Sequence, residues 1–244
     1  MGGLARRASY VRSVRERETN VILLDVGNVF GDGGEQGQRQ AEMAIKAMEL
    51  MNYDALNLGR GEFLFGRSFL EEQRESASFP FLSANLVAPD PEEHPYAAYV
   101  VKEAGHLKVG IVGLVWPEPY PGREPAAQDP TDTLKALLPQ VKEQAHFVVV
   151  LAQVGYARAV ELIHDVEGID VVIIGDVEES VTEPLKIDET LLVECTRWGM
   201  AVGELQITGN TDGKIVDYQW RNGILDQQIA DDPQVVELMR RYGQ

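Results

Sequence analysis

Four times along the chain, an apolar run ends at a short polar turn that contains glycine. The first run covers residues 21–24 and is followed by Asp25 and Gly27, and the pattern returns at 55–62, 147–155 and 171–178. Runs that are apolar at every position are typical of fully buried parallel strands. Because open α/β sheets bind ligands at the carboxyl ends of their strands, we expect these turns to meet at one rim that carries any chemistry.

The segments between these runs have the periodicity of amphipathic helices. Residues 3–17 place four apolar side chains on one face and arginines on the others; the four are Leu4, Ala8, Val11 and Val14. Similar spacing predicts helices around 41–51, 67–77, 134–141 and 160–168. Helices alternating with buried strands favour an α/β fold.

The pattern changes in the C-terminal third of the chain, where short predicted strands are joined by turns. We expect an antiparallel meander of four strands: 185–187, 190–194, 201–208 and 214–220. A last helix is predicted where Asp232 supplies a cap and Pro233 the first helical residue. Further strands are predicted in FPFLSANL (79–86) and in a hairpin around 103–105, and the proline-rich stretch 116–130 is expected to form a pocket wall near the rim.

Composition narrows the classes of function. The chain has 244 residues, 44% of them hydrophobic, and no linker divides it, so we expect a single domain over residues 1–244. Its net charge of -17 argues against nucleic acid and anionic membranes as partners. The single cysteine, Cys195, excludes an internal disulfide or a cysteine zinc cluster. We find no apolar signal segment or membrane-spanning run, which leaves the compartment unknown.

Several segments together resemble the calcineurin-like metallophosphoesterase domain of the 5′-nucleotidase family. In chain order they are GGLARRASYVRSVRERETNVILLDVGN, MNYDALNLGRGEFLFG, FPFLSANL, LKVGIVGL, VVVLAQVG, GIDVVIIGDVE and ADDPQVVELMRRY. The resemblance runs from Gly2 to the C-terminus. It implies an α/β fold of mixed sheets in a four-layer αββα sandwich, and family members are commonly exported.

The resemblance also implies a site for two divalent metals that hydrolyses phosphate esters. In the family the ligands come from Asp-x-His on a first strand, Gly-Asp, Gly-Asn-His-Glu, a third-loop His and Gly-His-x-His. A metal-bound hydroxide attacks phosphorus. We expect the first strand, which precedes the GGLAR helix, and the nucleoside-binding C-terminal domain of the family to be missing from this chain.

Carried over position by position, the ligand motifs are degenerate. The metal-ligand positions correspond to Asn28, Arg60, Gln153, Asp176 and Glu178. Gly61 stands where the family has the His that assists the leaving group or the transition state. We hypothesise that the Arg60 guanidinium occupies the vacated metal space and pairs with Asp176 or Glu178. A solvated Arg60 is the plainer alternative.

Other chemistry at the rim stays open at this point. An all-oxygen Ca²⁺ or Mg²⁺ site would use Asn28, Gln153, Asp176 and Glu178, but two formal charges beside an arginine disfavour it. Asp25 is expected to accept backbone hydrogen bonds as a structural residue. Further possible rim or ligand contacts are Gly61, Glu62, Arg197 and Trp198, although a surface stack of Arg197 on Trp198 is the plainer account of that pair; Asp32 lies near the rim without an assigned task.

Three functions remain from the sequence. The first is a non-catalytic binding or assembly module, with a protein partner or self-association and no cofactor. The second is a phosphomonoester hydrolase completed by an upstream segment or a partner chain, using Mn²⁺, Mg²⁺, Ca²⁺ or Zn²⁺. The third is a binder of a small anion through Arg60.

Overall fold

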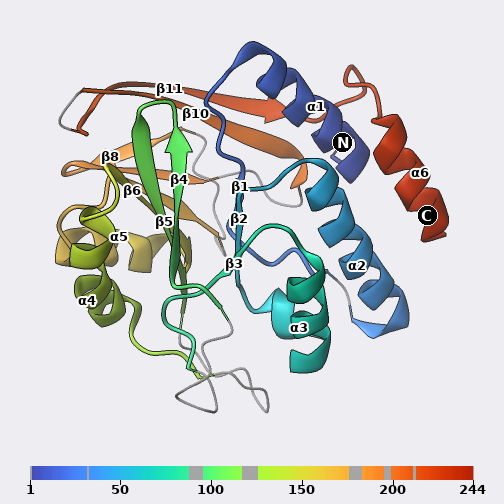
Figure 1. Cartoon of the computed structure of the whole chain (residues 1–244), viewed down its shortest axis with the longest axis horizontal. Coiled ribbons are helices and arrows are strands. Elements are labelled where there is room, and N and C mark those ends of the chain that lie inside the picture. Colours follow the sequence, from blue (N-terminus) through green and yellow to red (C-terminus); the bar gives the residue numbers. More distant parts are fainter. Residues whose placement is uncertain are drawn as a thin grey trace.

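The computed structural model describes residues 2–31, 33–87, 96–116, 126–175, 183–194, 199–210 and 213–243. They form two facing β-layers with helices on both outer sides, which confirms the predicted α/β four-layer sandwich of mixed sheets (Figure 1). No helix among these residues is long and apolar enough to span a membrane.

The larger sheet has six strands in the order β4-β5-β6-β7-β9-β8. Four central strands are parallel: β5 (Leu107–Val115), β6 (Phe147–Gln153), β7 (Val171–Ile174) and β9 (Thr190–Glu194). The antiparallel edge strands are β4 (Tyr99–Ala104) and β8 (Leu185–Ile187). Helices α4 (Pro130–Lys142) and α5 (Tyr156–Asp165) cover its outer face. An apolar layer centred on Leu134, Val150 and Leu162 lies between them.

The facing layer consists of a parallel sheet and a hairpin. The sheet contains β1 (Leu24–Asp25), β2 (Ala55–Asn57) and β3 (Phe81–Leu82), in that order. The antiparallel hairpin contains β10 (Ala201–Gly209) and β11 (Ile215–Ile224). A second apolar layer, which includes Leu82, Val149 and Leu151, fills the space between this layer and the six-stranded sheet.

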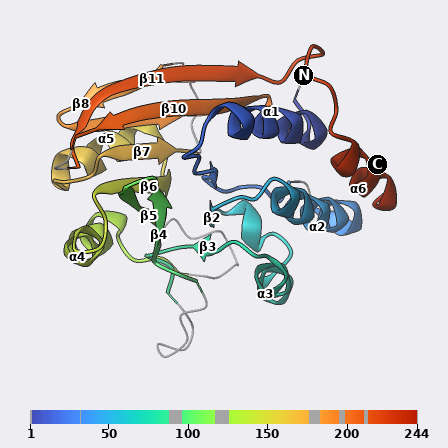
Figure 2. The ribbon, with the colours of Figure 1, turned by 45° about the horizontal axis from the view of Figure 1, so that its top comes forward.

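The outer side of this layer is covered by helices that lie together with both chain ends (Figure 2). They are α1 (Leu4–Arg17), α2 (Gly34–Leu50), the 3-10 turn η1 (Gly61–Phe63), α3 (Arg67–Ser76) and α6 (Pro233–Arg241). A third apolar layer, including Met48, Leu56 and Phe81, joins them to the small sheet. The last helix begins as predicted, because the Asp232 carboxylate accepts hydrogen bonds from Gln234 N and Val235 N.

Three strand predictions were wrong in detail. The run at 21–24 was expected to be a fully buried strand, but β1 has two residues and both are half-buried. The strand predicted at 79–86 shrinks to Phe81–Leu82. The C-terminal strands do not form one meander, since β9 pairs parallel to β7 in the large sheet while β10 and β11 pair only with each other among the described residues. These differences arise from pairing between strands that are distant in the sequence, and the local pattern of apolar residues does not specify that pairing.

Candidate functional site

The predicted rim forms where the loop after β1 meets the carboxyl ends of β2 and β6. Asn28 follows β1, Glu62 lies in η1 just after β2, and Gln153 is the last residue of β6. The Asn28 Nδ2 atom donates a hydrogen bond to Gln153 Oε1 at 3.1 Å. The two β-layers are therefore joined at the rim by the side chains of two predicted site residues.

The Glu62 carboxylate holds the loops of this rim together through buried hydrogen bonds. It is completely buried and accepts hydrogen bonds from the backbone N–H of Gly59 (2.7 Å), Asn28 (2.9 Å), Val29 (2.6 Å) and Phe30 (3.4 Å). Burial raises the pKa of Glu62, while the N–H donors of Asn28, Gly59 and Val29 lower that pKa. Glu62 therefore fixes the loop after β1 on the loop after β2.

The backbone of the loop after β1 is shaped for this approach. Gly27 has φ 107°, and a Cβ there would lie 2.6 Å from the Asn57 carbonyl oxygen, so only glycine fits. Asn28 has φ 61°, in the left-handed region that asparagine tolerates better than most residues. The turn directs the Asn28 amide toward η1 and β6.

Asn28 uses both ends of its amide. Its Oδ1 atom accepts a hydrogen bond from Gly61 N at 2.8 Å, and its Nδ2 donates to Gln153 as described. A carboxylate could accept the first hydrogen bond but could not donate the second. This pair of contacts is therefore specific to an amide at position 28.

Gln153 is 5% exposed and lies between the loop after β1 and the end of β7. A Cβ built on Gly175, the residue after β7, would come within 2.4 Å of Gln153 Nε2. The side chain is thus packed against the backbone of Gly175, which leaves its Oε1 directed at Asn28.

Asp25 has the kind of contacts expected of a structural residue. Its carboxylate accepts a hydrogen bond from Gly27 N at 3.1 Å and lies 3.7 Å from the Arg7 guanidinium. Burial raises the pKa of Asp25, and Arg7 and the backbone donor oppose that rise. These contacts tie the end of β1 to α1.

Arg60 is half-buried immediately before η1. Its hypothesised partners Asp176 and Glu178 lie outside the described residues, as do Asp32, Arg197, Trp198 and Cys195. The pairing of Arg60 with either acid therefore stays a prediction. Gly61 and Glu62 lie in η1, directly beside it.

The described donor set does not fit a pair of divalent metals. The neutral amide oxygens of Asn28 and Gln153 are both engaged in hydrogen bonds, and both Glu62 oxygens face backbone donors. Within the described ranges, no group of three or more His, Cys, Asp or Glu side chains is placed to hold a metal. Two adjacent dications need several negative charges and imidazole nitrogen; of these three residues only Glu62 is charged, its oxygens already accept backbone hydrogen bonds, and none is a histidine.

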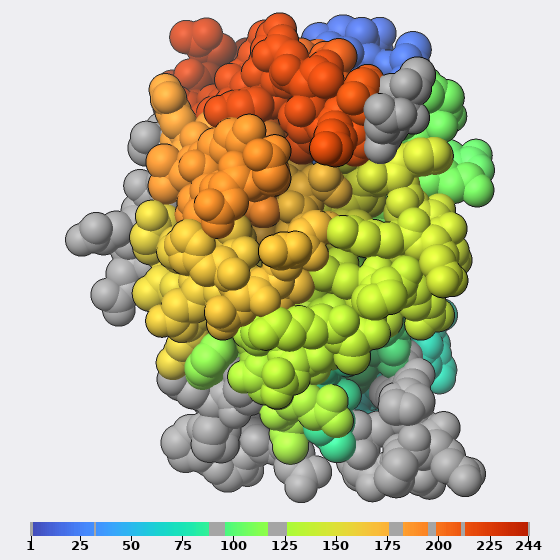
Figure 3. All heavy atoms as spheres, turned by 90° about the vertical axis from the view of Figure 1, so that its left-hand side faces the viewer, coloured from blue at the N-terminus to red at the C-terminus, as the bar shows by residue number. Residues whose placement is uncertain are grey.

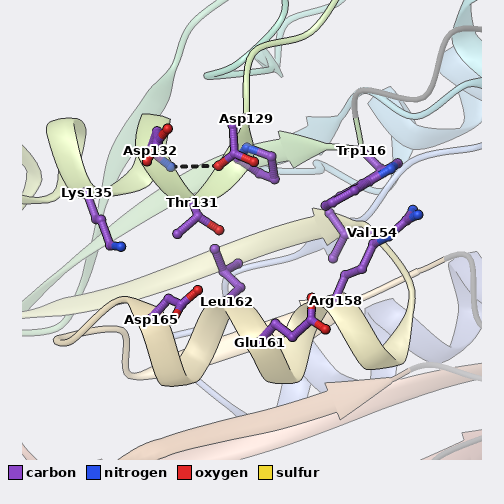
Figure 4. Close-up of a pocket in the computed structure, with 11 residues that line it drawn as sticks. Trp116, Asp129, Thr131, Asp132, Lys135, Val154, Arg158, Glu161, Leu162 and Asp165 are labelled. Carbon is purple, nitrogen blue, oxygen red and sulfur yellow. Dashed lines mark hydrogen bonds between the residues drawn. The ribbon is translucent and has the colours of Figure 1, made fainter.

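A separate hollow of about 340 Å³ lies on the helical side of the large sheet, between α4 and α5 (Figure 4). Its wall includes Trp116, against which the Arg158 guanidinium stacks 3.6 Å from the ring centroid, and Asp129, which caps α4. Residues 116 and 129–130 thus line a pocket, whereas 117–125 of the expected wall lie outside the described residues. No pattern in the sequence indicated the α5 side of this hollow.

Solved structures place the fold among the calcineurin-like phosphoesterases. A 5′-nucleotidase precursor from Thermus thermophilus superimposes with a TM-score of 0.88 at 27% identity, covering 99% of this chain and 53% of that one. A calcineurin-like phosphoesterase from Bacillus subtilis gives a TM-score of 0.83 at 22% identity, covering 99% of this chain and 88% of that one.

Sequence comparisons agree with the structural ones. Human 5′-nucleotidase is 28% identical over 264 residues, which is 96% of this chain and 46% of the relative. A 2′,3′-cyclic-nucleotide 2′-phosphodiesterase/3′-nucleotidase from Salmonella typhimurium is 25% identical over 207 residues, 71% of this chain and 32% of the relative. No model of a known protein family matches the chain. The resemblance to the 5′-nucleotidase family is confirmed, and the chain spans about a third to a half of these curated relatives.

Proposed function

We propose that this chain is a metallophosphoesterase-like domain that has lost dinuclear-metal catalysis and serves as a non-catalytic binding or assembly module. The hydrogen bond from Asn28 Nδ2 to Gln153 Oε1 carries the proposal. It joins two positions at which the family resemblance implies metal ligands. A metal at either amide oxygen would compete with an existing hydrogen bond and would gain no negative charge.

The space around Gly61 supports the same proposal. A Cβ at Gly61 would lie 2.9 Å from the Phe30 carbonyl oxygen and 3.1 Å from Asn28 Cα. A histidine here, which the resemblance implies for active relatives, would require the loop after β1 to move. Glu62 holds that loop through buried hydrogen bonds, so the movement would be costly.

The edge of β1 supports a role in binding a partner. Among the described residues β1 pairs only with β2, and the neighbouring Ile22, Leu24 and Val26 are half-buried. An unpaired strand edge with partly exposed apolar side chains is a site where another strand can add. We propose that a segment of a partner, or of a longer version of this chain, adds there.

Metal binding and turnover test the loss of catalysis. We expect calorimetric titration with Mn²⁺ to show no saturable binding, and p-nitrophenyl phosphate and AMP to be hydrolysed no faster than in buffer. The matched control is the double variant Asn28→Ala, Gln153→Ala, purified in the same way so that its preparation contains the same contaminating phosphatases. Chelator-sensitive turnover that the wild-type chain shows and this variant lacks would overturn the proposal.

The second candidate is a metal-dependent phosphomonoester hydrolase completed by an upstream segment or partner chain. Its support is the similarity to nucleotidases at 27–28% identity. The same assay on a longer chain or a reconstituted complex separates the two candidates, because only a hydrolase gains chelator-sensitive turnover. Titration with inorganic phosphate, with Arg60→Ala as the control, tests the third candidate, a binder of small anions.

A further inference from the structure

The β10-β11 hairpin has a long outer edge on the side of β11 that faces away from β10. No described strand pairs with that edge. In Figure 2 β11 is the outermost strand of the hairpin, and in Figure 3 the hairpin, coloured orange to red, reaches the outline of the molecule. Three large apolar side chains of β11 are exposed: Val216 (61%), Tyr218 (36%) and Ile224 (56%). Such an edge is a natural place for strand addition.

The hairpin is held in place from the inside. Tyr10 and Arg17 of α1 both hydrogen-bond to Glu204 of β10, and Gln206 donates to Glu18 at 2.8 Å. The Tyr10 ring fits only because residue 223 is a glycine, since a Cβ there would lie 2.1 Å from the ring. The edge of β11 is therefore presented by a braced hairpin, which lowers the entropic cost of binding.

The usable part of the edge runs from Asp217 to Ile224. Within it β11 pairs residue by residue with β10, and a bulge between Thr208 and Gly209 breaks the register beyond Asp217. One face of this segment carries an acid and a base four residues apart, Asp217 and Arg221. Both are exposed; the Asp217 carboxylate accepts a hydrogen bond from Tyr218 N at 2.9 Å, and Arg221 lies directly across from Glu204 of β10 in the hairpin register.

We propose that β11 pairs antiparallel with β11 of a second copy of this chain, with the two-fold axis at Gln219. Asp217 then lies opposite Arg221 of the partner subunit, and Arg221 lies opposite Asp217 of the partner subunit. Tyr218 lies opposite Trp220 of the partner subunit on the other face. Cross-strand pairs of opposite charge and of aromatic rings stabilise antiparallel strands.

Charge complementarity selects this register. An axis at Tyr218 or Trp220 places each charge opposite an uncharged residue. An axis at Asp217 or Arg221 places like charges opposite one another. A two-fold axis across the strand requires antiparallel pairing, so each favourable pair occurs twice. The net charge of -17 opposes association at long range, but physiological salt screens repulsion beyond about 8 Å.

An interface built on one strand is small, so we expect a reversible dimer with a dissociation constant in the micromolar range. Sedimentation equilibrium of the wild-type chain measures it. Asp217→Arg and Arg221→Asp each convert both pairs to like charges, and each should weaken the dimer about tenfold or more. The double variant with both substitutions restores opposite charges in the same register and should regain wild-type affinity within about threefold.

Glu72→Arg is the matched control, because it changes the net charge as Asp217→Arg does but lies on an exposed face of α3. It should leave the dimer intact. Circular dichroism of each variant checks folding. A chain that stays monomeric at every concentration, or a dimer that the single reversals do not weaken or the double variant does not restore, overturns the proposal. A dimer through the β1 edge would be insensitive to all of these variants, so it would be recognised separately.

Discussion

The six-stranded sheet and the small sheet face each other across one apolar layer, but they are held together in different ways. In the large sheet, β6 is buried at all seven positions, pairs along its whole length with β5 and pairs over residues 149–152 with β7. In the small sheet, β1 has two residues and, among the described strands, pairs only with β2. Backbone hydrogen bonds between long neighbouring strands stabilise the large sheet, whereas the strands of the small sheet are too short to be stabilised in this way.

Polar side chains replace the missing ladder in the small sheet. Asn57 is fully buried and its Nδ2 atom donates to the carbonyl oxygens of Val26 (3.0 Å) and Leu114 (3.1 Å), which bridges the two sheets. Asp54 accepts from Leu23 N at 2.8 Å, and Glu62 accepts from the loop after β1. The half of the molecule that carries the rim is thus stabilised by specific polar contacts, which leave less tolerance for substitution than apolar packing.

Truncating one leucine in each sheet should give the largest contrast. Leu151 of β6 is fully buried between the sheets, whereas Leu24 of β1 is half-buried. We expect Leu151→Ala to lower the free energy of unfolding by about 3 to 5 kcal/mol and Leu24→Ala by about 1 kcal/mol. Urea denaturation of both variants measures the difference. Equal losses would mean that the β1 edge is covered in solution, as an added strand would do.

Glu62→Gln should give the next largest effect. In the wild-type chain each Glu62 oxygen accepts from backbone N–H donors. The amide of the variant would keep one acceptor oxygen, but its NH₂ group would point at two backbone N–H donors that face a carboxylate oxygen in the wild type. We expect a loss of about 2 to 4 kcal/mol in the free energy of unfolding. Glu72→Gln, on the exposed face of α3, is the matched control and should change stability by less than about 0.5 kcal/mol. Similar values for the two variants would show that the rim does not depend on Glu62.

The large sheet could be predicted better from the sequence than the small one. The apolar run at 147–152 became β6, because a strand with a neighbour on each side is buried at every position. The run at 21–24 has equal apolar content, yet its residues are half-buried, because burial depends on neighbours that the run itself does not specify. The parallel pairing of β9 with β7 depends on the whole chain in the same way.

The candidate site, too, could be predicted from the sequence only in part. The rule for the carboxyl ends of strands predicted that the turns holding Asn28 and Gln153 would meet, and their side chains are hydrogen-bonded. Neither the direction of the Asn28 amide nor the burial of Glu62 could be predicted, because both depend on side-chain geometry. A Glu directly after a glycine-containing turn was the available indication that a carboxylate accepts backbone donors there.

The smallest effect concerns a carboxyl group in the large sheet and its dependence on pH. Asp170 accepts a hydrogen bond from Val148 N at 2.7 Å, and burial raises its pKa despite that bond and nearby Lys142. A raised pKa in the folded state favours the protonated form, so the contribution to stability is complete below the unfolded pKa of about 3.9 and is lost as pH rises through the folded pKa. Asp170→Asn keeps the acceptor without the charge. Urea denaturation of both proteins between pH 3.5 and 7 should therefore show that the variant gains stability relative to wild type as pH rises. The gain in free energy of unfolding should be smaller than the losses expected for Leu151→Ala and Glu62→Gln. A relative loss would mean that Lys142 and the Val148 donor outweigh burial.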